Sequence, residues 1–246
     1  MSAAAHRVPP TARPALHQML VLAAALGLCP LAAQVIGDDP SAPIGRAKAL
    51  VDAERALGIH IEPAVHAWAL ERPALLAAAS VFYVVAHVAV AGWALVWTWY
   101  VRRDRFGMVR DVLIWTQILL VAVYMLVPTA PPRLLPDAGF TDTLGRLWGR
   151  ELADSAHLLQ SPFAAVPSGH VAFALVAGMT FARLGDMAWL RAFGWVYPPL
   201  VVAVTVITAH HLLFDAVAAA LVVAVAAAAA WSRREVRRCR RTNVGA

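Results

Sequence analysis

A histidine and an aspartate lie four residues apart in the stretch 210–215 (HHLLFD). Residues at this spacing share one face of a helix, with Cβ atoms about 5–6 Å apart. The Asp215 carboxylate could hold one nitrogen of His211 and leave the other free as a nucleophile or a base. The alternative is an interfacial acid, but an aspartate at the centre of a span costs roughly 2.5–3.5 kcal/mol, so even near a span end it should have a partner.

A second cluster, Pro167-Ser168-Gly169-His170, opens an apolar stretch. Ser168 is a favourable N-cap residue, and Gly169 would allow the backbone to approach a ligand closely. The N-terminus of a helix offers free N–H groups and a positive dipole to an anion. Capping alone also explains a Ser-Gly pair, and it is His170 beside the cap that favours a ligand site.

An arginine follows a run of prolines at residues 128–133 (PTAPPR). Prolines end a helix and stiffen the chain that leaves it, so Arg133 would be held at a fixed place just outside an apolar block. A guanidinium group suits bidentate phosphate binding. The alternative is an interfacial arginine that anchors to lipid headgroups.

The three clusters together provide a guanidinium group, a helix N-terminus and two histidines, one of them backed by a carboxylate. This set suits phosphoryl transfer through a phosphohistidine. The sequence shows no cluster of carboxylates for magnesium, and no cysteine or third well-placed histidine for zinc. We therefore expect neither a metal nor another cofactor.

Six apolar blocks must position these side chains. Of the 246 residues, 61% are hydrophobic and 15% charged, against about 25% charged in soluble domains. Each block approaches the roughly 20 residues that a span requires. The blocks are 16–36, 74–101, 112–130, 167–182, 192–209 and 212–231. The sequence predicts an all-α, polytopic membrane bundle of about six helices.

The bundle would form a single membrane domain over residues 1–246, with an N-terminal tail (1–15), a six-helix core (16–232) and a basic tail (233–246). The first block also resembles a secretory signal peptide, and its cleavage would leave five spans. The two cysteines, Cys29 and Cys239, predict no disulfide framework.

Basic residues are distributed unevenly among the connecting segments. Of the 21 lysines and arginines, fourteen precede the first block, follow the sixth, or lie between blocks two and three or four and five. The positive-inside rule then predicts both termini in the cytoplasm and all three polar clusters on the outer face. The net charge of +6 thus reports membrane orientation, and we expect no nucleic acid as a partner.

The outer segment 37–73 and the remaining histidines have secondary roles in this interpretation. Charged residues from Arg46 to Arg55 alternate with apolar ones, as in an amphipathic helix at the membrane interface that serves as a lid or a spacer. His87 is expected to be a packing histidine within the second span. The other histidines lack partner spacing, or lie off the face of Asp215: His60, His66, His157 and His210.

The motifs resemble those of the type-2 phosphatidate phosphatase superfamily, which includes the vanadium haloperoxidases. Residues 167–170 match its P-S-G-H motif, and His211 with Asp215 matches the H-x-x-x-D end of its last motif. The resemblance implies that His211, oriented by Asp215, attacks phosphorus. It implies that His170 protonates the leaving oxygen and then activates the acceptor.

The position of Arg133 corresponds to the first phosphate-binding motif of that superfamily, so the resemblance makes Arg133, Ser168 and Gly169 the phosphate ligands. Two cations of the usual motifs are missing, since Leu126 replaces the lysine of K-x6-R-P and Thr205 replaces the arginine of S-R-x5-H-x3-D. This variant resembles the branch of inositol phosphorylceramide synthases, which use two histidines and an aspartate. That branch transfers a phosphorylated headgroup between lipids.

The sequence therefore predicts an enzyme of the plasma membrane, a lipid phosphatase or phosphotransferase with its site facing outside the cytoplasm. Its partner would be a lipid phosphate in the bilayer, and no protein partner is evident. Two alternatives are a transporter, which would place polar groups at the midplane, and a catalytically inactive scaffold, which the missing cations would explain.

Overall fold

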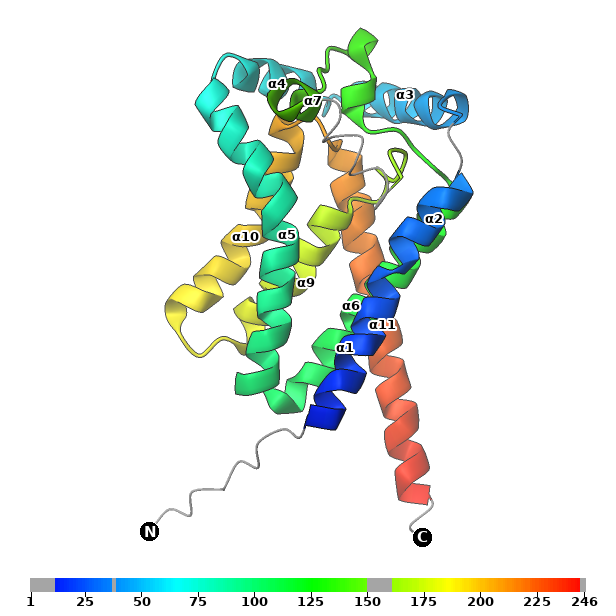
Figure 1. The fold of residues 1–246 in the computed structure, drawn as a ribbon, viewed down its shortest axis with the longest axis vertical. Coiled ribbons are helices and arrows are strands. Elements are labelled where there is room, and N and C mark those ends of the chain that lie inside the picture. Colours follow the sequence, from blue (N-terminus) through cyan, green and yellow to red (C-terminus); the bar gives the residue numbers. More distant parts are fainter. Residues whose placement is uncertain (1–11, 37–38, 150–160, 244–246) are drawn as a thin grey trace.

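The computed structural model describes residues 12–36, 39–149 and 161–243, which form helices, turns and one isolated parallel bridge between Thr129 and Ala164. The long helices stand side by side and two shorter ones lie across one end of the bundle (Figure 1). The α-helices are α1 (Ala12–Leu26), α2 (Leu28–Ile36), α3 (Ser41–Ala56), α4 (Glu62–Leu70), α5 (Pro73–Val101), α6 (Arg103–Leu126), α7 (Thr143–Trp148), α9 (Gly169–Leu184), α10 (Ala188–Ile207) and α11 (Leu213–Asn243). The 3-10 turns are η1 (Pro132–Leu134) and η2 (Pro136–Ala138).

Within the described residues, four helices are long and apolar enough to cross a membrane: α5, α6, α10 and residues Leu213–Glu235 of α11. Along α5 and α11, valines such as Val88 and Val217 are more than half exposed, as expected of a surface that faces lipid. The all-helical membrane fold that the sequence predicts is confirmed. The number of six spans stays a prediction.

The first predicted span, 16–36, is divided into α1 and α2 at Gly27. Pro30 has no N–H group, and its ring clashes with the carbonyl four residues earlier, which belongs to Leu26, the last residue of α1. Neither half reaches the length of a full span by itself.

The third predicted span, 112–130, is wrong at both ends. Helix α6 begins at Arg103, because arginine side chains can extend along the helix to the interface and need no separate loop. It ends at Leu126, since the residue before Pro128 is disfavoured in a helical conformation. The last helix is also longer than the span predicted for it, because α11 continues from its apolar part into the predicted basic tail and ends at Asn243.

Helix α9 lies at the centre of the bundle, against α5, α6, α10 and α11. Its 16 residues rise about 24 Å, which is less than the hydrocarbon core of a bilayer. Ala172, Ala174 and Phe181 are fully buried, so neighbouring helices rather than lipid surround it. A central helix of this kind can be short because its ends are covered by protein.

Helix α9 packs most closely against α10 where two glycines meet. A Cβ atom on Gly178 would lie 2.6 Å from the Gly194 carbonyl oxygen and 2.6 Å from Pro198 Cγ. Pro198 leaves that carbonyl without its usual helical donor, and small residues let the two backbones approach.

The two ends of the bundle differ. We call the end at the top of Figure 1 the upper end: it comprises α3, α4, α7 and the turns 127–142, 161–168 and 208–212. The lower end comprises the α5–α6 and α9–α10 turns, the start of α1 and the end of α11. The predicted amphipathic helix is α3, whose buried residues Ala47 and Val51 pack over the turns of the upper end.

Candidate active site

Backbone hydrogen bonds bring the three polar clusters together at the upper end. The turn after α6 pairs with the turn before α9 through Thr129, and the other two bonds join each of these turns to the 208–215 segment. The donors and acceptors are Thr129 N to Phe163 O (2.7 Å), Arg133 N to Ala209 O (2.8 Å) and Ser168 N to Asp215 O (3.1 Å). Segments up to 86 residues apart in the sequence (129 to 215) therefore form one unit.

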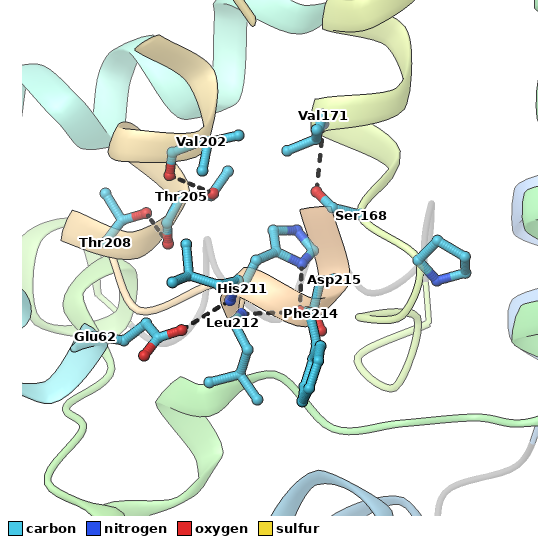
Figure 2. A network of polar contacts seen from close by, with 12 residues as sticks. Glu62, Ser168, Val171, Val202, Thr205, Thr208, His211, Leu212, Phe214 and Asp215 are labelled. Atoms are coloured by element: carbon cyan, nitrogen blue, oxygen red, sulfur yellow. Dashed lines mark hydrogen bonds and ion pairs between the residues drawn. The ribbon is translucent and has the colours of Figure 1, made fainter. Parts of the chain in front are cut away.

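His211 and Asp215 make the expected contact, with His211 Nδ1 3.1 Å from Asp215 Oδ2 (Figure 2). The same carboxylate oxygen accepts the Leu212 N–H at 3.0 Å. An ionised carboxylate only accepts hydrogen bonds, so this contact assigns a proton to Nδ1 of His211 and leaves Nε2 as the nitrogen not bound to Asp215. Both side chains are buried, His211 at 5% and Asp215 at 1% exposure.

The reason given by the sequence for this contact needs correction. His211 does not share a helix face with Asp215, because α11 begins only at Leu213. The Asp215 side chain reaches back from the first turn of α11 to the preceding turn, where Ala209 has a positive φ of 56°. The carboxylate therefore fixes the turn as well as the imidazole.

His170 lies in the first turn of α9, as predicted, with its ring centroid 6.0 Å from that of His211. Ser168 is the N-cap, and its Oγ accepts the Val171 N–H at 3.3 Å (Figure 2). The predicted approach of a ligand to Gly169 stays a prediction, and the structure shows a close contact at this position. A Cβ atom there would lie 3.2 Å from the Tyr124 hydroxyl, which donates to the Pro167 carbonyl at 2.8 Å.

Helix α5 contributes two residues that the sequence interpretation missed as part of this cluster. Tyr83 stacks on His170 with ring centroids 3.9 Å apart, and His87 lies 4.0 Å from His170. Tyr83 also contacts His210, at 4.0 Å. The spacing of Tyr83 and His87, four residues apart on one face of a span, was the available signal.

His210 also belongs to the cluster, although the sequence analysis set it aside. It is 2% exposed, and neither ring nitrogen has a hydrogen-bond partner within the described part of the chain. Burial lowers the pKa of His210 well below its ordinary value, and the nearby Arg133 guanidinium lowers it further. Burial and the Arg133 charge thus both disfavour a positive charge on the His210 imidazole.

Arg133 is held at the site by its backbone bond to Ala209 and by its position in η1. Its side chain is largely buried, and Nε lies 4.0 Å from Asp142 Oδ1. This distance allows only a loose ion pair, so the guanidinium can bind another anion.

Two buried glutamates, Glu54 of α3 and Glu62 of α4, bind the backbone at the start of α11. Glu62 Oε1 accepts the Leu213 N–H at 2.8 Å, and Glu54 Oε1 accepts the Phe214 N–H at 2.9 Å. Both glutamates are fully buried.

The expectation that His60 has no partner is wrong, since its Nδ1 lies 3.1 Å from Glu54 Oε2. His66 is structural: its Nδ1 donates to Ile207 O at 2.9 Å. His157 lies outside the described residues.

A comparison with protein-family models matches residues 48–229 to the PAP2 superfamily. The match covers well over half of the chain and includes all three polar clusters. The chain belongs to the PAP2 superfamily. The comparisons with curated proteins and with solved structures gave no match.

Membership of the PAP2 superfamily supports a phosphatase-type activity on phosphate esters. The match begins at Lys48, so it also includes the last turns of α3, all of α4, and Glu54 and Glu62. The likeness to inositol phosphorylceramide synthases and the roles of the individual residues stay predictions.

Proposed function

We propose that this PAP2 superfamily protein is a membrane lipid phosphatase or phosphotransferase that works through a phosphohistidine on His211. The observation that carries the proposal is the meeting of Arg133, the N-terminus of α9 and the 210–215 segment at one end of the bundle. We favour an enzyme over a transporter because Arg133, Ser168 and His211 all lie in turns at the ends of helices.

In the proposed reaction, Nε2 of His211 attacks phosphorus while the bond from phosphorus to the leaving oxygen breaks. Asp215, which accepts the hydrogen bond from Nδ1–H of His211, stabilises the positive charge that develops on the imidazole. His170 donates a proton to the leaving oxygen. Its ring lies 6.0 Å from that of His211, close enough for both to reach one phosphoryl group.

His170 then takes a proton from the acceptor, which attacks phosphorus and releases His211. Water as the acceptor gives free phosphate, and a lipid alcohol gives a new phospholipid. Arg133, the Ser168 hydroxyl and the start of α9 would bind the phosphate oxygens. The chemistry of these groups suits phosphatidate, a polyprenyl phosphate or a phosphoinositol lipid.

The distribution of arginines supports an extracytoplasmic site. Arginines gather at the lower end, in the turn at Arg102, in the α9–α10 region from Arg183 to Arg191, and along the last turns of α11. The positive-inside rule assigns that end to the cytoplasm, which leaves the upper end outside the plasma membrane.

The test is phosphate release by the purified protein from a panel of lipid phosphates, with lipid products analysed in parallel. We expect His211→Ala and His170→Ala to lower kcat by at least about 10³-fold and 10²-fold. A new lipid in place of free phosphate would identify a transferase. Wild-type activity in both variants on every substrate would rule out the catalytic assignment.

A further inference from the structure

Three side chains from neighbouring elements of the upper end converge beside the start of α11. Glu54 comes from the last turn of α3, His60 from the connecting turn, and Glu62 from the first residue of α4. His60 Nδ1 lies 3.1 Å from Glu54 Oε2 and 3.3 Å from Glu62 Oε2. The glutamates are fully buried and the His60 side chain is 8% exposed.

Each glutamate divides its two oxygens between two tasks. The Oε1 atoms accept the Leu213 and Phe214 N–H groups, so they are already used by α11. The Oε2 atoms both face His60 Nδ1, which can offer them a single proton. Among the described residues, Glu62 Oε2 is buried without a hydrogen-bond partner.

This arrangement leaves Glu62 Oε2 with only its 3.3 Å contact to His60 Nδ1, an atom that it shares with Glu54 Oε2. A carboxylate that is removed from water without a partner costs several kcal/mol, so a proton or a cation must neutralise it. The described ion pairs of Glu54 and Glu62 involve His60 alone. The three inward-facing atoms of the cluster can therefore share one more positive species.

The geometry suits a small tetrahedral cation. Zinc binds imidazole nitrogen at about 2.0–2.1 Å and carboxylate oxygen at about 2.0–2.2 Å, which places tetrahedral ligands roughly 3.3–3.5 Å apart. The separations of 3.1 and 3.3 Å lie close to this range, and the three ligand atoms lie within 4.8 Å of one another. Calcium requires six to eight oxygens and magnesium retains several waters, whereas zinc would need only one further ligand, a single water, beside the three protein atoms.

We propose that Glu54, His60 and Glu62 bind a zinc ion, or a divalent cation of the same ligand preference, that fixes α3 and α4 to the start of α11. The ion replaces the proton on His60 Nδ1 and bridges the two Oε2 atoms. It is a structural ion, separate from the proposed chemistry at His211. The proposal does not depend on the substrate or on a phosphohistidine.

The first experiment uses the full-length protein in detergent, stripped with a chelator and then dialysed against zinc chloride. Bound zinc per chain is measured by mass spectrometry after desalting, and the Tm is measured with and without zinc. We expect about one equivalent of zinc and a Tm increase of several degrees. Substoichiometric zinc with no change in Tm would overturn the proposal.

A matched pair of variants separates the ion from a shared proton. Glu62→Gln retains an oxygen that can accept the Leu213 N–H but loses the charged ligand, so we expect loss of the bound zinc and of the zinc-dependent Tm increase. Asp137→Asn, an exposed acid of the same end, should keep both. Equal zinc binding by Glu62→Gln and wild type would place the metal elsewhere. Phosphate release is measured in parallel, so a failure of the catalytic proposal is recognised independently.

Discussion

The upper and lower ends of the bundle carry charged side chains in opposite ways. At the lower end, Arg105 and Asp104 form an ion pair in which the side chains are 62% and 71% exposed. At the upper end, the acids Glu54, Glu62 and Asp215 are at most 1% exposed. Charges in such an exposed pair remain in water at the interface, whereas these three acids of the upper end have lost their hydration.

This difference in exposure indicates where the stability of the fold depends on contacts between polar groups. A buried charge is tolerated only where hydrogen bonds and opposite charges replace water, and the upper end supplies them from α3, α4, α9 and α11 together. An exposed ion pair contributes little by itself. Substitutions of these buried groups should therefore have large effects, and substitutions of exposed charges such as Arg105 small ones.

The largest expected effect is that of Asp215→Asn on catalysis. The amide cannot stabilise a positive charge on His211 and does not enforce the Nδ1 proton, so kcat should fall by about 10²–10⁴-fold, equivalent to roughly 3–5 kcal/mol. Phosphate release under saturating substrate measures kcat. Arg105→Ala at the lower end is the control and should keep its rate. A loss below twofold in Asp215→Asn would remove the carboxylate from the mechanism.

A smaller effect is expected for Arg133→Lys. Lysine keeps the charge but loses the planar fork that binds two phosphate oxygens, so KM should rise about 10- to 100-fold with a lesser change in kcat. The matched control is Arg46→Lys at the same end. Arg46 lies on α3 and donates to the Pro128 carbonyl, a hydrogen bond that a lysine can also make, so this variant should keep wild-type kinetics. If both variants keep wild-type kinetics, Arg133 is an interfacial anchor.

Gly178→Ala tests the helix that connects the two ends. A Cβ atom at this position would lie 2.6 Å from the backbone oxygen of Gly194, which cannot move independently of α10. We expect a loss of about 1–3 kcal/mol in stability, seen as a lower Tm. Gly92→Ala on α5 is the control, since nothing lies within 4 Å of its Cβ position. Equal Tm values for the two variants would contradict the close α9–α10 contact.

The sequence predicted those features that depend on local patterns. Long apolar runs identified the helices, Ser168 identified the start of α9, and the four-residue spacing identified the contact between His211 and Asp215. Their exact ends were less predictable, because arginines at a span end can belong to the helix, as Arg103 does in α6.

The features that were missed depend on contacts between distant elements. His87 reaches His170 only because α5 packs against α9, and the four-residue spacing of Tyr83 and His87 marks a polar face of α5 without naming its partner. Glu54 lies on the buried face of α3, three residues after Val51, which was the one local sign that this acid is not a surface residue. The identity of the lipid depends on surfaces that composition does not describe.

The smallest expected effect belongs to Arg105→Ala at the lower end. Its ion pair with Asp104 is exposed and involves adjacent residues, so its loss should change stability by no more than about 1 kcal/mol, and less at high salt. Arg102→Ala is the informative neighbour, because Arg102 Nε donates to the Leu184 carbonyl at 3.1 Å and so joins the α5–α6 turn to the end of α9. We expect a larger decrease in Tm for Arg102→Ala than for Arg105→Ala. The reverse order would show that exposure at the lower end does not predict the contribution of a charge, and the contrast between the two ends would then be wrong.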